Sequence, residues 1–204
     1  MKRTLFLFLY LVWLGFSYNG IPNFYAEFLM SYNNIGIKIL LILVFDLLFH
    51  RYLQESFKSL YFLDLLKIGG ITTTGIILTV GFINMVLFRE TDVILFNYPV
   101  DQRTIPLLLD SILVAPIFEE MLFRFTLIYV GEKKYLRAFT ALVSIFLFAL
   151  NHIQNVEGNL FLLFPYLVIG IYLTIVYLRK KNIFESIFAH AFYNSIVILL
   201  ATLF

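Results

Sequence analysis

Apolar residues run along this chain in long stretches that short polar segments interrupt. A helix needs about 20 mostly apolar residues to cross the hydrocarbon core of a bilayer, with a range of about 17–25. We predict seven membrane spans from this pattern: Thr4–Tyr18, Ile35–Phe49, Leu65–Phe88, Ile105–Val130, Leu136–Asn155, Leu160–Leu178 and Ile183–Phe204. The polar connections are only loop-sized, so we expect a single all-α integral-membrane domain over residues 1–204.

Composition supports membrane lipid as the surrounding medium. The sequence is 61% hydrophobic and 14% charged, and its mean hydropathy is +0.91. A soluble domain is about half apolar and about a quarter charged, and a small core cannot hide this apolar excess. The net charge of +2 is too small to indicate a nucleic-acid partner. The chain has no cysteine, which excludes disulfides and thiolate metal sites.

Lysine and arginine predict the orientation, because cytoplasmic loops carry an excess of these residues. We place the N-terminus in the cytoplasm and interpret the first apolar stretch as an uncleaved anchor. The cytoplasmic side then holds Lys2, Arg3, Arg51, Lys58, Lys67, Lys133, Lys134, Arg137, Arg179, Lys180 and Lys181. The outer side holds Lys38, Arg89 and Arg103. We therefore expect a multi-pass protein of the plasma membrane. An eighth short segment would also fit and would leave the later spans unchanged.

The fourth predicted span contains charged residues near its centre. Each charge at the centre of a membrane helix costs about 2.5–3.5 kcal/mol, so such residues face the protein interior and find partners. Glu120 and Arg124 are four residues apart and can pair on one helix face. Glu119 lies about 100° further round the helix, where it is suited to accept a proton. Asp110, nearer the outer end, is expected to meet headgroups or water.

Two later spans each contain a histidine at a helical spacing from a second notable residue. Phe148 and His152 share a face of the fifth span, and His190 and Asn194 share a face of the last. A glutamate, two histidines and an asparagine are groups that can activate a water and stabilise an oxyanion. From the helical rise, Glu119 and both histidines lie roughly 10–24 Å from the cytoplasmic ends, so they can meet if the helices tilt.

These residues resemble, in order, the three motifs of a known family of intramembrane proteases. The motifs are Glu119-Glu120-x-x-x-Arg124, Phe148-x-x-x-His152 and His190-x-x-x-Asn194. They are similar to those of the CAAX prenyl-protease and bacteriocin-processing (CPBP) family, over residues 107–200. No motif position departs from the family pattern, and the first hundred residues carry nothing diagnostic.

The resemblance implies an endopeptidase that hydrolyses a peptide bond of a membrane-associated protein or peptide. Carried over by position, Glu119 and His152 would activate the water. His190 and Asn194 would stabilise the oxyanion. The residues that would support the site are Glu120, Arg124 and Phe148. Family substrates range from prenylated protein C-termini to peptides linked to bacteriocin production, immunity or signalling, and the small size of the chain favours a bacterial source.

The family has been described both as metalloproteases and as metal-independent glutamate enzymes. Zinc would take Glu119, His152 and His190, because histidine and carboxylate are ligands that zinc prefers. The spacing is not the His-Glu-x-x-His of zinc proteases, and an asparagine beside a histidine favours an oxyanion site. We therefore favour no metal and no other cofactor, with zinc as the alternative.

Two further functions use the same residues. A proton-coupled transporter could use the buried carboxylate and histidines as a relay, although such proteins usually show repeated halves and this sequence shows no repeat. A non-catalytic membrane scaffold or immunity protein could keep the fold alone, with Glu120 and Arg124 as a structural ion pair. The serines, Ser144 and Ser186 among them, lack the Gly-x-Ser-x-Gly setting of a serine nucleophile. The sequence does not predict the oligomeric state.

Overall fold

The computed structural model describes residues 2–18, 34–87, 105–156 and 159–203, and every regular element within these ranges is helical. Seven long helical segments follow one another along the described chain. They are α1 (Lys2–Tyr18), α3 (Asn34–Lys58), α4 (Phe62–Leu87), a composite helix over residues 105–126, α7 (Lys134–Leu150), α8 (Phe164–Lys180) and α9 (Ile183–Leu203). Each overlaps one predicted span, so the all-α prediction is confirmed for the described residues.

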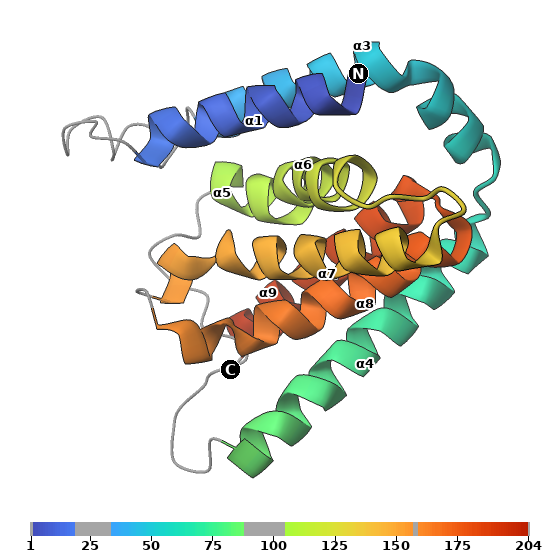
Figure 1. The fold of residues 1–204 in the computed structure, drawn as a ribbon. Coiled ribbons are helices and arrows are strands. Elements are labelled where there is room, and N and C mark those ends of the chain that lie inside the picture. Colours follow the sequence, from blue (N-terminus) through green and yellow to red (C-terminus); the bar gives the residue numbers. More distant parts are fainter. Residues whose placement is uncertain (1, 19–33, 88–104, 157–158, 204) are drawn as a thin grey trace.

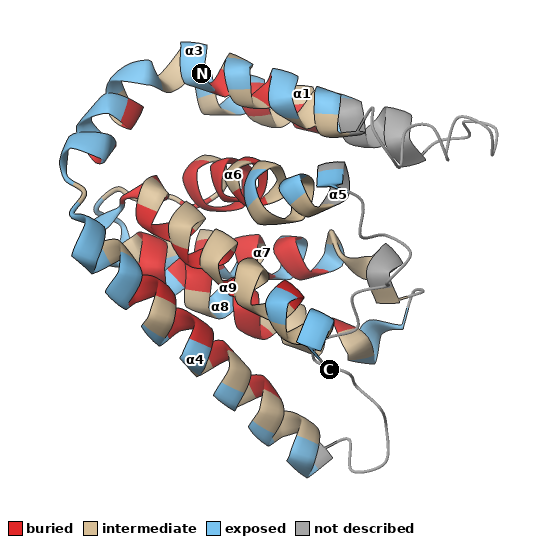
Figure 2. Cartoon of the chain, turned by 180° about the vertical axis from the view of Figure 1, so that it is seen from behind, coloured by how far each residue is buried: buried red, intermediate tan, exposed pale blue. Residues whose placement is uncertain are grey.

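The composite helix lies in the middle of the fold. It runs between the pair formed by α1 and α3 and the group formed by α7, α8 and α9 (Figure 1). Helix α8 packs on both α7 and α9, and α4 packs along α8 and α9 on the side away from α1. Buried residues concentrate on the composite helix and on the inner sides of α7, α8 and α9 (Figure 2). The charged residues of the fourth predicted span are therefore at the centre of the protein.

The composite helix differs from the uninterrupted span Ile105–Val130 that the sequence predicts. It consists of α5 (Ile105–Leu109), the π-helix η3 (Asp110–Val114), α6 (Ala115–Glu119) and a second π-helix, η4 (Glu120–Thr126). The predicted end was wrong because apolar residues continue beyond the helix: Ile128 is fully buried in the following loop. The apolar residues after Thr126 are apolar because they pack in the core, and they do not extend the helix. π-helical turns are rare and are often found at functional sites.

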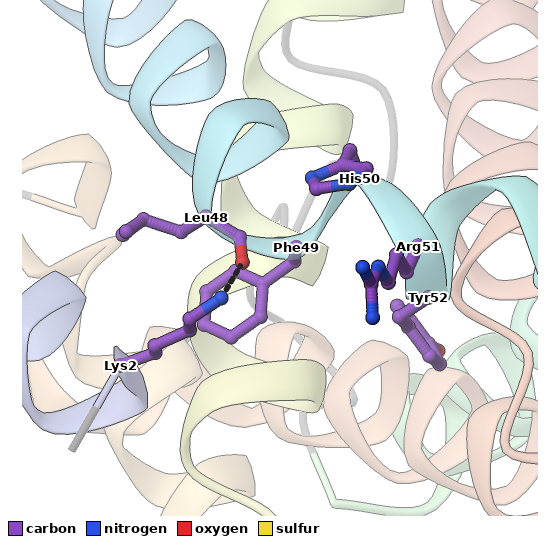
Figure 3. Close-up of a pocket in the computed structure, with 6 residues that line it drawn as sticks. All are labelled: Lys2, Leu48, Phe49, His50, Arg51 and Tyr52. Atoms are coloured by element: carbon purple, nitrogen blue, oxygen red, sulfur yellow. Dashed lines mark hydrogen bonds between the residues drawn. The ribbon is translucent and has the colours of Figure 1, made fainter.

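Helix α3 continues past its predicted end at Phe49. The backbone of Phe49 (φ −124°, ψ 16°) leaves the helical conformation, and the helix resumes as far as Lys58. On α1, the Nζ of Lys2 donates a hydrogen bond to the Leu48 carbonyl at 2.9 Å. Figure 3 shows this bond beside a cavity of about 490 Å³, lined by Lys2 and residues 48–52. The end of the apolar stretch therefore marks a kink in α3 and not its C-terminus.

The distribution of side chains is that of a membrane protein. Large apolar side chains such as Leu78 (67% exposed) and Phe82 (63% exposed) face outward, whereas Glu120 and Arg124 are fully buried. This is the reverse of a soluble protein, in which ionised side chains face water. Among the described residues, three helices are long and apolar enough to cross a membrane: Phe62–Val86, Leu160–Lys180 and Ile183–Leu203. The remaining helices are shorter or more charged, so the seven-span count stays a prediction.

Segments that the charge pattern assigns to the cytoplasm meet at one end of the bundle. The Nη1 of Arg3 donates to the carbonyl of Ile128, and the Nζ of Lys181 donates to that of Val130, both at 3.3 Å. The hydroxyl of Tyr52, beyond the kink in α3, donates to the Lys181 carbonyl at 2.9 Å. These contacts connect four segments: the start of α1, the end of α3, the loop after the composite helix and the α8–α9 turn.

Asp110 pairs with a lysine, a contact that its position in the sequence did not indicate. Its Oδ2 lies 2.8 Å from the Nζ of Lys38, in the first turns of α3, and the two side chains are only 17% and 12% exposed. A partly buried carboxylate is costly without a cation, and α3 supplies Lys38 as that cation. The pair links α3 to the first π-helical segment.

The predicted orientation can be tested with single cysteines, because the chain has none of its own. Lys58, Lys133 and Asn159 are exposed in the structure. We expect Lys58→Cys and Lys133→Cys to react with a membrane-impermeant maleimide only after permeabilisation, since basic loops stay in the cytoplasm. Asn159→Cys should react in intact cells. The reverse pattern of labelling would contradict the predicted orientation.

Helices α7 and α8 approach each other closely at Gly170. A Cβ atom at this position would lie 3.3 Å from Cδ1 of Phe148 and 3.4 Å from Cγ2 of Ile145. We expect Gly170→Leu to lower the free energy of unfolding by about 1–3 kcal/mol, because it overpacks this contact. Gly81→Leu on α4 is the control, since nothing lies within 4 Å of a Cβ there. Denaturation in detergent micelles measures both variants, and equal losses would refute the argument.

Candidate functional site

Glu119 lies at the centre of a cluster to which three helices contribute. It is the last residue of α6, and its Oε1 lies 4.0 Å from Nε2 of His152, just beyond the end of α7. Its Oε2 lies 3.9 Å from Nε2 of His190 in α9. Glu119 is 8% exposed and His190 is 4% exposed. The structure therefore brings together the carboxylate and the two imidazoles that the sequence singled out.

The two adjacent glutamates both face protein because no side of the helix is exposed at this point. Adjacent side chains of an α-helix are about 100° apart, so a helix at the lipid boundary would turn one of them outward. Residues 118–125, however, are all buried, since α1, α3, α7 and α9 surround this part of the composite helix. Two carboxylates in sequence can thus occupy two different environments inside the protein.

Glu120 is held by three partners. Its Oε1 accepts a hydrogen bond from Nδ1 of His190 at 3.1 Å, and its Oε2 lies 3.3 Å from Nε of Arg124. The hydroxyl of Ser186 also donates to Oε2. All four residues are buried. The predicted pairing of Glu120 with Arg124 is confirmed, and the carboxylate is also tied to α9 at two points.

Both histidines turn the same ring nitrogen toward Glu119. Nδ1 of His152 lies 2.9 Å from the Phe148 carbonyl, which can only accept, so this nitrogen carries a hydrogen. Nδ1 of His190 donates to the Glu120 carboxylate in the same way. In each ring Nε2 is left to face Glu119. The end of α7 at Leu150 makes the His152 contact possible, because the chain turns there and brings the ring back over Phe148.

Aromatic rings enclose the polar groups. The Phe148 ring centroid lies 4.9 Å from that of His152 and 5.7 Å from that of His190. The guanidinium carbon of Arg124 lies 4.6 Å from the same centroid, within the range of a cation–π contact. Tyr166 of α8 stacks on the other side of His152, with centroids 4.3 Å apart and planes at 21°. The predicted contact between Phe148 and His152 is therefore present. Phe148 also contacts His190 and Arg124.

Asn194 makes a contact that the sequence did not predict. Its Nδ2 donates to the carbonyl of Ser111 at 2.8 Å, in the first π-helical segment. In the i→i−5 pattern of a π-helix, the donor to Ser111 would be the backbone nitrogen of residue 116. That residue is Pro116, which has no N–H. Asn194 therefore satisfies a carbonyl that the proline leaves free, and this bond uses one of the two hydrogens of its amide nitrogen.

The separations of Glu119 from the two imidazoles can be compared with those that a shared water or a shared zinc ion would give. Two hydrogen bonds of about 2.8 Å that meet at one water hold their outer atoms about 4.0–4.6 Å apart. Two ligands of a tetrahedral zinc ion lie closer, at about 3.3–3.6 Å. The measured separations of 4.0 and 3.9 Å match the first spacing better. Glu119, His152 and His190 are ligands of the kinds that zinc binds, but Glu119 lies further from each imidazole than two ligands of one zinc ion would lie.

Two residues of the site were not predicted to belong to it. Ser186 precedes His190 by four residues, so the helical spacing that linked His190 to Asn194 could also have found it. Tyr166 had no such signal, because its stacking on His152 depends on how α8 packs against the end of α7. A tyrosine of the first helix also reaches this region: the hydroxyl of Tyr10 donates to Oδ1 of Asn151 at 3.3 Å.

Comparisons with known proteins concern the part of the chain that carries the site. Residues 101–196 match the family model described as type II CAAX prenyl endopeptidase Rce1-like. The UPF0177 protein YbdJ of Lactococcus lactis subsp. lactis (strain IL1403) is 38% identical over 88 residues, which cover 43% of this chain and 36% of that protein. The match thus spans about a third of the relative's length. No solved structure matches the chain.

The family match includes all three motifs and the residues that surround Glu119. It confirms the resemblance that the motifs indicated, and the Lactococcus relative shows that a similar sequence occurs in a bacterium. Residues 101–196, just under half of the chain, are thus similar to the Rce1-like CAAX prenyl endopeptidases.

Proposed function

We propose that this protein is an intramembrane endopeptidase that hydrolyses a peptide bond of a membrane-associated protein or peptide with a water activated by Glu119. The observation that carries the proposal is the position of Glu119: each carboxylate oxygen faces the Nε2 of a histidine at about 4 Å. The surrounding sequence matches a family named for endopeptidases. A carboxylate and imidazoles in an enclosed site are the groups that general acid–base hydrolysis needs.

In this mechanism a water lies between Glu119 and His152. Glu119 takes a proton from the water as its oxygen attacks the carbonyl carbon of the peptide bond, which gives a tetrahedral intermediate with a negatively charged oxygen. The proton then passes from Glu119 to the leaving amine nitrogen as the carbon–nitrogen bond breaks. One water is consumed, and the products are a carboxylic acid and an amine. Because the site is enclosed, these charges interact more strongly than they would in water.

The group that faces Nδ1 differs between the two histidines, so the two rings suit different roles. The Nδ1 of His190 faces a carboxylate, which can neutralise the charge of a doubly protonated ring. Nε2 of such a ring carries a hydrogen and can donate to the oxyanion. The Nδ1 of His152 faces a neutral carbonyl, and the Nε2 of a singly protonated ring is free to accept a hydrogen from the water. The remaining N–H of the Asn194 amide is the second donor that we assign to the oxyanion.

We propose that this hydrolysis needs no metal. The support is the spacing of Glu119 from the two imidazoles, which fits a hydrogen-bonded water better than two ligands of one ion. In the alternative, zinc held by Glu119, His152 and His190 would polarise the peptide carbonyl and its bound water.

The setting of the reaction forms part of the proposal. We place the protein in the plasma membrane of a bacterium as a multi-pass protein with a cytoplasmic N-terminus. Its substrate class is a membrane-associated peptide or protein, since the site is surrounded by helices that expose large apolar side chains on their outer faces. A role in bacteriocin processing, self-immunity or signalling rests on the family resemblance alone.

Replacement of Glu119 tests the reaction directly. We expect Glu119→Gln to reduce cleavage by about 10²- to 10⁴-fold, the usual contribution of a general base, because the amide keeps the shape of the side chain and cannot take the proton. Labelled peptide termini from membranes of cells that express each variant would be compared by mass spectrometry. Glu55→Gln, on an exposed part of α3, is the control and should leave the termini unchanged.

The same variants separate the rival functions. If Glu119→Gln and wild type yield identical termini while the variant retains the cellular phenotype, the protein acts as a scaffold or immunity protein. If proton flux into liposomes is present in wild type and abolished in Glu119→Gln, the relay of a transporter is indicated. Either result would refute the endopeptidase proposal.

Removal of metal tests the second part of the mechanism. Once a cleaved substrate is identified from the labelled termini, we expect the purified protein to retain full activity after treatment with a strong zinc chelator. The physical reason is that Glu119 alone can serve as the base for the bound water. Elemental analysis of the treated protein would verify that zinc is absent. Loss of cleavage that added zinc restores would show that the ion is required.

A further inference from the structure

We propose that Ser186 is a positioning residue that holds the Glu120 carboxylate in the rotation that keeps His190 directed at Glu119. This inference rests on the proposed function in one respect: the direction of the His190 ring matters for catalysis only if Glu119 is the general base. Ser186 is fully buried, lies in α9, and donates its hydroxyl hydrogen to Oε2 of Glu120. It lies one helical turn before His190, so α9 holds Glu120 with two side chains from the same face.

The two oxygens of Glu120 are tied in different directions. Oε1 accepts from Nδ1 of His190, whereas Oε2 accepts from Ser186 and lies beside Nε of Arg124. The Ser186 hydroxyl has a second acceptor within reach, the Leu173 carbonyl at 3.3 Å. Its single hydrogen goes to the charged acceptor, because hydrogen bonds to ions are the stronger ones. Rotation of the carboxylate would break the bonds to α9 at both oxygens.

Arg124 favours a different rotation of the Glu120 carboxylate. Its Nη1 and Nη2 are buried and have no hydrogen-bond partner among the described residues. A guanidinium prefers a two-pronged pair with a carboxylate, in which two N–H groups meet two oxygens. If Ser186 did not hold Oε2, Glu120 would gain by turning both oxygens toward Arg124. Oε1 would then leave Nδ1 of His190.

The consequence reaches Glu119 through the histidine ring. With Nδ1 bonded to Glu120, the Nε2 of His190 faces Oε2 of Glu119 at 3.9 Å. A ring released from Glu120 can carry its hydrogen on either nitrogen, so Nε2 is no longer fixed as the nitrogen without a hydrogen bond to Glu120. Ser186 therefore acts on the reacting groups through two intermediates, Glu120 and His190, without touching Glu119.

The test uses the small number of histidines in the chain, which is three. Protein labelled with ¹⁵N-histidine in micelles gives imidazole signals for His50, His152 and His190, and His50→Gln and His190→Gln assign them. In wild type we expect the Nδ1 of His190 to show the resonance of a protonated nitrogen. In Ser186→Ala this resonance should move toward the range of an unprotonated nitrogen, while the His152 signals stay in place.

Ser144→Ala is the matched control. Ser144 is also a fully buried serine. Its hydroxyl donates to the carbonyl of Phe123 at 2.6 Å, and Phe123 lies in η4, the π-helix that begins at Glu120. We expect this variant to leave the His190 signals unchanged. Ser186→Cys is measured as well, and it should show the same shift to a smaller extent because a thiol is a weak donor.

Two results would overturn the proposal: a His190 Nδ1 resonance that stays at its wild-type position in both Ser186 variants, or an equal shift in Ser144→Ala. The measurement needs no substrate. A failure of Ser186 as a positioning residue is therefore distinguishable from a failure of the endopeptidase proposal, which the Glu119→Gln comparison of peptide termini decides.

Discussion

The burial of the Glu120 carboxylate is the constraint on which the rest of the site depends. An ionised carboxylate inside a membrane protein is tolerated only when partners replace the water it has lost. Here the partners come from the same helix and from α9: Arg124 in the first case, Ser186 and His190 in the second. The hydrogen bonds from Ser186 and His190 to Glu120 thus link the composite helix to α9. Because His190 is one of the partners, the same contacts set the direction of the ring that faces Glu119.

The irregular helix geometry serves the same purpose. Both π-helical segments leave backbone carbonyls to be satisfied by side chains from neighbouring helices, as Asn194 does for Ser111 and Ser144 does for Phe123. Each such bond replaces a hydrogen bond inside the helix with one between helices, so the irregular segment is stable only in contact with α7 and α9. The local distortion of the composite helix is therefore part of what positions α7 and α9 around the site.

The sequence predicted the helices and the principal members of the site for a simple physical reason. A long apolar run is costly to expose to water, and an ionised residue within it is costly to expose to lipid. Few structures avoid both costs, so these patterns predict a structure well. The sequence did not predict the kink in α3 or the π-helical geometry of the composite helix. The kink at Phe49 and the π-helical segments depend on contacts with distant residues, such as Lys2 on Leu48 and Asn194 on Ser111. The role of Ser186 was hidden for a related reason, since a serine motif concerns nucleophiles and not the orientation of a carboxylate.

The difference between the two adjacent glutamates follows from how firmly each is held. Glu120 has three close partners, and any proton it gained would weaken contacts to all of them. Glu119 has its nearest ring nitrogens at 3.9 and 4.0 Å, too far for direct hydrogen bonds. A change in its protonation therefore breaks no direct hydrogen bond to either ring. In the proposed mechanism the general base gains and loses a proton in each cycle, and it is best placed where no close hydrogen bond depends on its charge. Glu119 meets this condition at the two histidines, whereas Glu120 does not.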